Sequence, residues 1–169
     1  YSDPNHYQKL APKVAEELGA AVGNQFDNTA NRDAHYATTG PEIWRDTHGR
    51  IDAFTCATGT GGTLGGVSRY LKEQNPAIRI IGCQPEEGAQ IPGIRKWPEA
   101  YLPKIYDGSR VDQVESVGQG QAEEMTRRLA REEGIFAGIS SGGALVVALR
   151  IATRVENAVI VSIVCDRGD

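Results

Sequence analysis

Short, nearly uninterrupted apolar runs alternate with segments of helical spacing along most of the chain. Four such runs predict strands buried on both faces, at 51–57, 78–84, 111–117 and 158–165. Apolar residues spaced three or four apart predict helices over 67–74, 122–133 and 142–154. Because strands and helices alternate, we expect an α/β fold in three layers, a parallel sheet with helices on both faces.

The N-terminal residues follow a more polar pattern. Residues 1–5 are typical of a turn, and an amphipathic helix is expected after them. Leu10, Val14 and Leu18 lie four apart on one face of that helix, and Gly19 is expected to end it.

Two further segments are expected to be largely irregular. A short strand at 22–26 leads into an Asn-rich loop that extends to residue 33, and a helix begins near residue 39, where Pro41 occupies an early helical position. Between 85 and 110 the periodicity of helices and strands is lost, and Pro, Gly and aromatic residues are frequent. A loop of this length in a compact domain is usually a functional surface or a lid.

Composition narrows the function classes. The 169 residues include 18 Lys and Arg against 22 Asp and Glu, a net charge of −4, which argues against nucleic-acid binding through a broad basic face. No apolar run approaches the roughly 20 residues that span a bilayer. The three cysteines lie in or beside apolar runs without a Cys-x-x-Cys pair, so we expect buried free thiols in a cytoplasmic protein and no metal site, with disulfides or a metal as the alternatives.

The Gly-Thr-Gly-Gly-Thr turn at 59–63 is the strongest local signal for a ligand. Glycines let backbone N–H groups converge on an anion, and the following helix adds its positive N-terminal end, so a phosphate is expected. The turn lacks the lysine of a P-loop, and Leu64 stands where a dinucleotide fingerprint requires glycine. Glu86 nevertheless follows the next strand, where a ribose-binding acid would lie, so a dinucleotide remains an alternative, as does a strand-to-helix crossing without a ligand.

A second glycine-rich cluster, Gly-Ile-Ser-Ser-Gly-Gly-Ala at 138–144, opens a long apolar helix. Ser140 or Ser141 either caps the helix or presents a hydroxyl to a ligand ring. Ligands of parallel sheets bind beyond the carboxyl ends of the strands, which indicates residues 58–63 and the segment from Asp166 onward.

Together the two clusters resemble the fold type II family of pyridoxal-phosphate enzymes. Four further runs resemble the cysteine synthases (O-acetylserine sulfhydrylases) within that family, at 24–28, 38–44, 84–88 and 91–94. The runs at 94–98 and 165–169 are most similar to the B type of these enzymes.

The resemblance assigns a role to individual residues. It implies that the cofactor phosphate binds the turn residues Gly59, Thr60, Gly61, Gly62 and Thr63. Ser140 would face the pyridine nitrogen, and a neutral hydroxyl there does not enforce a protonated ring. It implies substrate contacts at Gln25, Gly88, Arg95 and Cys165. Arg95 as a solvated surface charge and Cys165 as a core residue at a strand end are the alternatives.

The implied reaction is a β-replacement that forms L-cysteine or S-sulfocysteine from O-acetyl-L-serine and sulfide or thiosulfate, in a cytoplasmic homodimer. Docking of a serine acetyltransferase stays open. Cystathionine β-synthase and serine or threonine dehydratases are neighbouring alternatives, and a non-catalytic phosphate- or nucleotide-binding module is an alternative of another class.

The matching motifs do not include the lysine that forms the Schiff base in this family. None of the lysines in this sequence stands in a matching context: Lys9, Lys13, Lys72, Lys96 and Lys104. We therefore expect the C-terminal portion of such an enzyme, inactive alone. Residues 1–20 would end the small domain, and 21–169 would form the large domain, shortened at both ends relative to the family.

Overall fold

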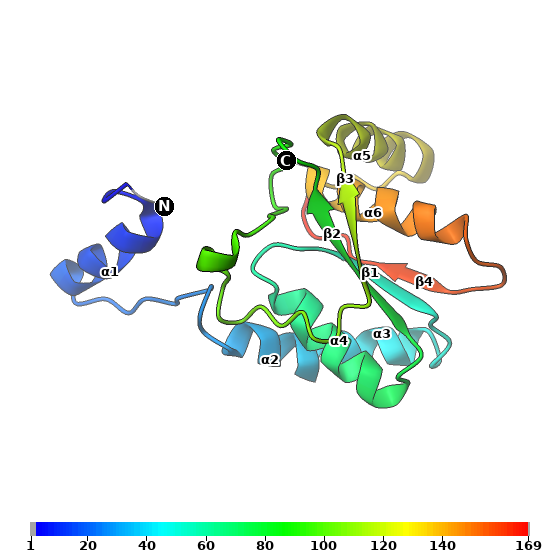
Figure 1. The fold of residues 1–169 in the computed structure, drawn as a ribbon, viewed down its shortest axis with the longest axis horizontal. Coiled ribbons are helices and arrows are strands. Elements are labelled where there is room, and N and C mark those ends of the chain that lie inside the picture. Colours follow the sequence, from blue (N-terminus) through cyan, green and yellow to red (C-terminus); the bar gives the residue numbers. More distant parts are fainter. Residues whose placement is uncertain (1–2, 169) are drawn as a thin grey trace.

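A computed structural model describes residues 3–168. Tyr1 and Ser2 of the expected N-terminal turn, and Asp169 of the C-terminal motif, lie outside the described residues. Four strands form one sheet in the order β3-β2-β1-β4, and each neighbouring pair is parallel. The strands are β1 (Ala53–Ala57), β2 (Arg79–Pro85), β3 (Gln113–Val117) and β4 (Ile160–Ser162). Figure 1 shows the sheet between two layers of helices, so the three-layer α/β prediction is confirmed.

The helices cover the two faces of the sheet in separate groups. One group consists of α2 (Ala30–Ala37), α3 (Thr39–Asp46) and α4 (Gly62–Gln74), and the other of α5 (Gln119–Glu133) and α6 (Ile139–Ala152). On the α4 side the fully buried Phe54, Val67 and Leu71 belong to one apolar cluster. On the α6 side Ile81 and Val147 belong to the other. Burial on both faces explains why the central strands are nearly continuous in apolar residues.

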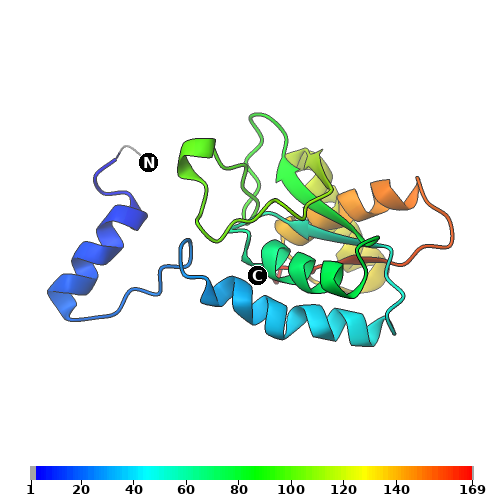
Figure 2. The same cartoon turned by 60° about the horizontal axis from the view of Figure 1, so that its bottom comes forward.

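The first helix lies apart from this body. The predicted helix is α1 (Tyr7–Leu18), and it ends at Gly19, whose φ of 61° is left-handed. Figures 1 and 2 show α1 on one side of the molecule, joined to α2 by an extended segment. Leu10, Val14 and Leu18 are all exposed, so the apolar face of this helix packs against little within residues 3–168.

Two predictions near the N-terminus are wrong in part. The strand expected at 22–26 is a turn, because Asn24 adopts a φ of 47° and its carbonyl accepts the N–H groups of Asp27 and Asn28. The Asn-rich loop ends sooner than expected. Asn28 Oδ1 accepts the N–H of Ala30 at 3.0 Å, and α2 begins there.

The glycine-rich segments contribute more helix than expected. α4 begins at Gly62 rather than at 67, and α6 begins at Ile139 rather than at 142. Glycine permits close helix packing at such positions: a Cβ on Gly66 would lie 2.3 Å from the carbonyl oxygen of Arg32 in α2.

The strand expected at 158–165 is shorter than predicted. β4 has only three residues and is half-buried, since it pairs with β1 alone at the edge of the described sheet.

The segment at 85–110 is irregular, as predicted. Within this described stretch the regular structure outside β2 is one 3-10 turn, η1 (Glu99–Tyr101). The loop is nevertheless fastened to the sheet: the Arg95 N–H donates to Thr58 O at 2.7 Å, and the Trp97 indole N–H donates to Gly59 O at 2.6 Å. These contacts bring the long loop to the carboxyl end of β1.

Candidate functional site

The glycine-rich turn stands where β1 ends and α4 begins. Thr58 continues the ladder, because its N–H donates to Cys83 O in β2 at 2.9 Å. Gly61 then turns the chain with a φ of 92°, which an L side chain rarely adopts, and α4 starts at the next residue. Thr60 Oγ1 accepts the Gly62 N–H at 3.4 Å. The turn therefore offers hydroxyl groups and backbone N–H groups at the positive end of a helix, which is an arrangement suited to an anion.

The five predicted phosphate-binding residues line one cavity of about 290 Å³. Its volume lies near the small end of the range of roughly 300–1,000 Å³ for small-ligand sites. The opposite wall includes the segment 163–165 after β4, and Gly93 of the long loop contributes as well. The structure thus brings Cys165, one residue before the indicated segment from Asp166 onward, to the turn at 59–63, whereas Asp166 is not among the residues that line this cavity.

His35 belongs to this site, although it stands in none of the sequence motifs. It lines the same cavity from α2, and its two ring nitrogens lie 2.9 Å from Thr39 Oγ1 and 3.1 Å from Thr63 Oγ1. Desolvation by burial lowers the pKa of His35, which favours the neutral ring. A neutral imidazole has one donor and one acceptor, so His35 can orient the Thr63 hydroxyl.

The second glycine-rich cluster surrounds the carboxylate of Asp166. Ser140 Oγ lies 2.7 Å from Asp166 Oδ2, and Ser141 Oγ lies 2.5 Å from Oδ1. The Ser141 N–H also donates to Oδ1, at 3.3 Å. The first turn of α6 is thus capped by a carboxylate from the segment after β4, whereas the serines themselves were the expected caps.

Ser140 lies behind the cavity wall instead of lining the cavity. It is only 2% exposed. A Cβ added to Gly93 would lie 2.9 Å from Ser140 Cβ, and the Ser140 hydroxyl lies within hydrogen-bonding reach of the Cys165 thiol. Both neighbours line the cavity, so Ser140 lies directly behind its wall.

The three cysteines differ in their environment. The prediction of buried free thiols is confirmed for Cys56 and Cys83 and wrong for Cys165, which is free but exposed because β4 ends at Ser162. Burial raises the pKa of Cys83 to about 12. Partial desolvation also raises the pKa of Cys165, so this thiol stays protonated near neutral pH.

The remaining predicted substrate residues lie at separate cavities. Gly88 and Arg95 line a cavity of about 650 Å³ on the loop after β2, and Arg95 is exposed. Gln25 lines a third cavity, of about 670 Å³, between α1 and the loop near Tyr101. The rings of Phe26 and Trp97 meet edge to face, with centroids 5.6 Å apart, and thereby connect the Gln25 segment to the phosphate turn.

Several other chemistries find little support. Glu86, the acid expected for a dinucleotide ribose, is exposed and lines the cavity of Gly88 instead of the phosphate cavity. Among residues 3–168 no group of three or more His, Cys, Asp and Glu could hold a metal ion. None of the helices described in that range is long and apolar enough to cross a membrane.

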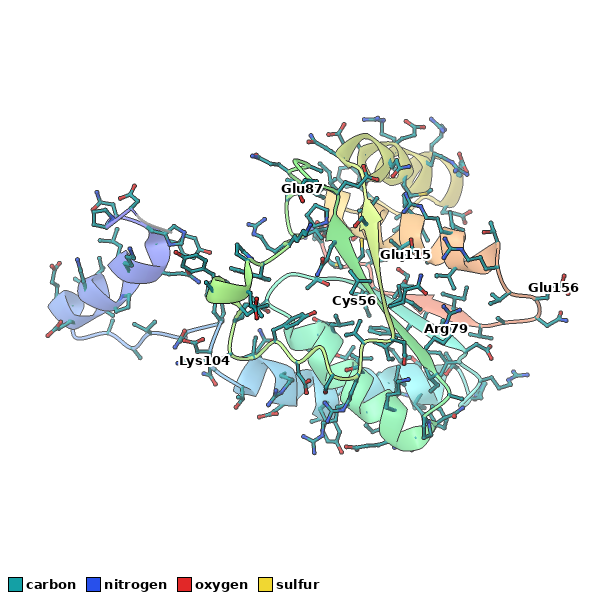
Figure 3. All side chains as sticks on the ribbon, viewed as in Figure 1. Cys56, Arg79, Glu87, Lys104, Glu115 and Glu156 are labelled. Carbon is teal, nitrogen blue, oxygen red and sulfur yellow. The ribbon has the colours of Figure 1, made fainter. Side chains whose placement is uncertain are left out.

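Lysine is absent from the described lining of the phosphate cavity. Lys72 pairs with Asp112 at 2.8 Å, and Lys96 pairs with Glu87 at 3.0 Å. Figure 3 shows Cys56 in the middle of the sheet, whereas Lys104 lies on the side of the body nearest α1.

Sequence comparison connects this geometry with known enzymes. A family model described as pyridoxal-phosphate dependent enzyme matches residues 1–166. The chain is 59% identical to cysteine synthase B of Pseudomonas aeruginosa over 160 residues, which cover 95% of the chain and 54% of that protein. It is 52% identical to cysteine synthase B of Escherichia coli, again over 160 residues, 95% of the chain and 53% of that protein. The chain spans about half the length of these curated relatives.

Solved structures agree with the sequence relatives. O-ureido-L-serine synthase matches with a TM-score of 0.88 and 34% identity, over 95% of this chain and 54% of that one. Cysteine synthase from Entamoeba histolytica matches with a TM-score of 0.85 and 35% identity, over 98% of this chain and 52% of that one. The family match and the fold agree, and the chain belongs to the family of pyridoxal-phosphate dependent enzymes.

Proposed function

We propose that this chain forms the cofactor-binding part of a cysteine synthase of the B type. The enzyme would form L-cysteine or S-sulfocysteine from O-acetyl-L-serine and sulfide or thiosulfate. The observation that carries the proposal is the turn at 59–63, which presents its N–H and hydroxyl groups at the start of α4 to a cavity shared with Cys165. The relatives named cysteine synthase B support the choice of reaction.

The residues at this cavity fit pyridoxal phosphate. Gly59, Thr60, Gly61, Gly62 and Thr63 would hold the phosphate, because the backbone turns at Gly61, which has no Cβ atom, and continues into a helix N-terminus. By the resemblance, Ser140 would bind the ring nitrogen; its neighbours Gly93 and Cys165 line the cavity, whereas Ser140 itself does not. The bound cofactor supplies an electron sink for the substrate carbanion. Cys165, Gln25, Gly88 and Arg95 would contact substrate.

The site also supports the expectation of an incomplete catalytic set. A pyridoxal-phosphate enzyme needs a lysine amine for its Schiff base and for proton transfer. No lysine reaches the described phosphate cavity, so we propose that the 169 residues bind the cofactor weakly and do not complete the reaction alone. Residues 1–20, with the exposed apolar face of α1, would belong to the small domain, and 21–169 to the large fold type II domain of a cytoplasmic homodimer.

Calorimetry with pyridoxal phosphate, NAD and ATP tests this proposal. We expect saturable binding of pyridoxal phosphate and no comparable binding of the two nucleotides. Gly61→Ala should weaken the binding at least tenfold, because a Cβ there would lie 2.7 Å from the Tyr106 ring and the φ of 92° would be strained. Gly19→Ala is the matched control, since Gly19 has a φ of 61° but a Cβ would meet nothing within 4 Å.

Three outcomes would contradict the proposal. Equal binding of nucleotides would favour a nucleotide-binding module, and absence of pyridoxal-phosphate binding would refute a cofactor site. A visible absorption band that forms with pyridoxal phosphate and shifts with O-acetylserine would show that this chain is catalytically complete. Turnover by the complete gene product with sulfide and thiosulfate would distinguish cysteine synthase from cystathionine β-synthase and the dehydratases.

A further inference from the structure

The long loop after β2 holds the glycine-rich turn through two successive carbonyl groups. The Arg95 N–H donates to Thr58 O at 2.7 Å, and the Trp97 indole N–H donates to Gly59 O at 2.6 Å. The first bond comes from the backbone, which every residue except proline supplies. The second comes from a side chain, so it depends on the identity of residue 97.

These two bonds determine the direction of the N–H groups that follow. The peptide bonds of this turn are trans, and in a trans peptide the carbonyl and the N–H of the next residue point in opposite directions. Because the Thr58 and Gly59 carbonyls point to the loop, the N–H groups of Gly59 and Thr60 point away from it. Both of these residues line the phosphate cavity, and within residues 3–168 neither N–H donates to a backbone carbonyl. The two N–H groups can therefore bind an anion.

The direction of each N–H matters at this site because cationic side chains contribute little. The described lining of the cavity contains no Lys or Arg, and desolvation lowers the pKa of His35, which is the imidazole there. An anion must depend on N–H and hydroxyl donors at the helix N-terminus. Hydrogen bonds to charged groups are stronger than those between neutral groups, so one misdirected donor should reduce the affinity measurably.

We propose that Trp97 is a positioning residue for the phosphate: its indole N–H holds the Gly59 carbonyl, and the Thr60 N–H therefore points into the cavity. The inference rests on the proposed function, which brings a phosphate group to this turn. Trp97 is not among the residues described as lining the cavity, so it acts through the peptide between Gly59 and Thr60. Without the indole donor this peptide can rotate, because glycine restricts the backbone little.

The indole is itself held in place by the segment before α2. The rings of Phe26 and Trp97 meet edge to face, with centroids 5.6 Å apart. Phe26 O accepts the Ile105 N–H at 3.3 Å, so the Phe26 segment is attached to the same long loop. A ring that is already held on one side loses less rotamer freedom when it forms a hydrogen bond. Phe26 thus supports the orientation of the indole toward Gly59.

Titration of the 169-residue chain with inorganic phosphate, followed by ³¹P NMR, tests the proposal. Trp97→Phe removes the donor and keeps an aromatic ring beside Phe26. We expect it to weaken phosphate binding about tenfold, the effect of one hydrogen bond to a charged group. Trp44→Phe is the matched control, because the Trp44 ring in α3 packs against Gly49, where a Cβ would lie 2.9 Å from it. The control should bind phosphate as tightly as the wild type.

Hydrogen exchange of the two indole protons provides a measurement that needs no variant. If the bond from Trp97 to Gly59 raises phosphate affinity about tenfold, bound phosphate stabilises that bond by the same factor. We therefore expect the Trp97 indole proton to exchange about tenfold more slowly in saturating phosphate, and the Trp44 indole proton to slow much less.

The amide signal of Thr60 separates positioning from a purely structural role. In the ¹H–¹⁵N spectrum of the wild type this signal should shift as phosphate is added. The shift should be lost in Trp97→Phe and kept in Trp44→Phe. If Trp97 only fastened the loop to the sheet, the Thr60 amide would respond to phosphate equally in both variants, and the inference would be wrong.

The remaining outcomes distinguish the inference from the proposed function. If the wild-type chain does not bind phosphate, both fail. If phosphate binds equally well to Trp97→Phe and the wild type, or if the two indole protons slow equally, the inference alone is overturned. Circular dichroism identifies a variant that does not fold, and hydrogen exchange in the wild-type chain then decides the question.

Discussion

Gly142 is the position where a single methyl group should most clearly disturb the packing of α6 on α5. A Cβ there would lie 2.2 Å from both Ala122 O and Thr126 Oγ1, and 2.9 Å from Thr126 N. Two of these atoms belong to the helix backbone and cannot rotate away. The Thr126 hydroxyl donates to Ala122 O at 2.8 Å, so its displacement would also cost a hydrogen bond.

The expected loss of folding stability in Gly142→Ala follows from two opposing effects. The two helices must separate by roughly 1 Å to restore ordinary contact, and overpacking of this kind costs about 1–3 kcal/mol. The better helix propensity of alanine returns about 0.5–1 kcal/mol. Since backbone atoms are involved, we expect the cost at its upper end, and Gly142→Ala should destabilise the fold by about 2 kcal/mol.

Urea unfolding followed by circular dichroism measures this change. With a slope of about 2 kcal/mol/M, the midpoint should fall by about 1 M. Gly120→Ala in α5 is the matched control, because a Cβ there would meet nothing within 4 Å, and its midpoint should stay equal or rise. If Gly142→Ala were as stable as wild type, the close approach of α5 and α6 would be refuted.

Three other expectations concern the site. In the native chain a thiol reagent should react with Cys165 first, and with the buried Cys56 and Cys83 only after unfolding; equal rates would contradict the burial. Thr63→Val should weaken inorganic phosphate binding roughly tenfold by ³¹P titration, since it removes one hydrogen bond to a charged group; unchanged affinity would remove Thr63 from the site. Because burial lowers the pKa of His35 from 6.5, the unfolded chain binds more protons below that pH, and stability should fall as pH decreases. His35→Gln should flatten this decline in urea midpoints between pH 7 and pH 5, and an unchanged slope would assign it to other groups.

The sheet could be predicted because its signal is local. β1 and β2 are buried on both faces, so their apolar runs end within two residues of the observed strands. The helix starts were harder to predict, because glycine has low helix propensity and hides the first turns of α4 and α6. The strand expected at 22–26 failed for another reason: its apolar residues have no partner strand among the described residues, and Asn24 turns the chain.

The candidate site likewise has a part that the sequence predicts and a part that it does not. The turn at 59–63 was predictable, since its glycines, hydroxyls and following helix are consecutive in the sequence. The contacts of His35 with Thr63 and of Asp166 with Ser140 join residues 28 and 26 positions apart, and no spacing rule relates them. The first contact depends on how α2 packs on α4. The second depends on how the segment that follows β4 runs back to the first turn of α6.

The parallel topology explains why these distant segments meet. β1 and β4 pair in parallel with Thr55 opposite Ser162, so both strands end at the same edge of the sheet. The glycine-rich turn continues from β1 there, and residues 163–166 continue from β4, which brings Cys165 to the cavity. One residue later Asp166 reaches the start of α6. The start of α4, where we propose the phosphate site, and Ser140 beside Asp166 are therefore both positioned by the parallel pairing of β1 with β4.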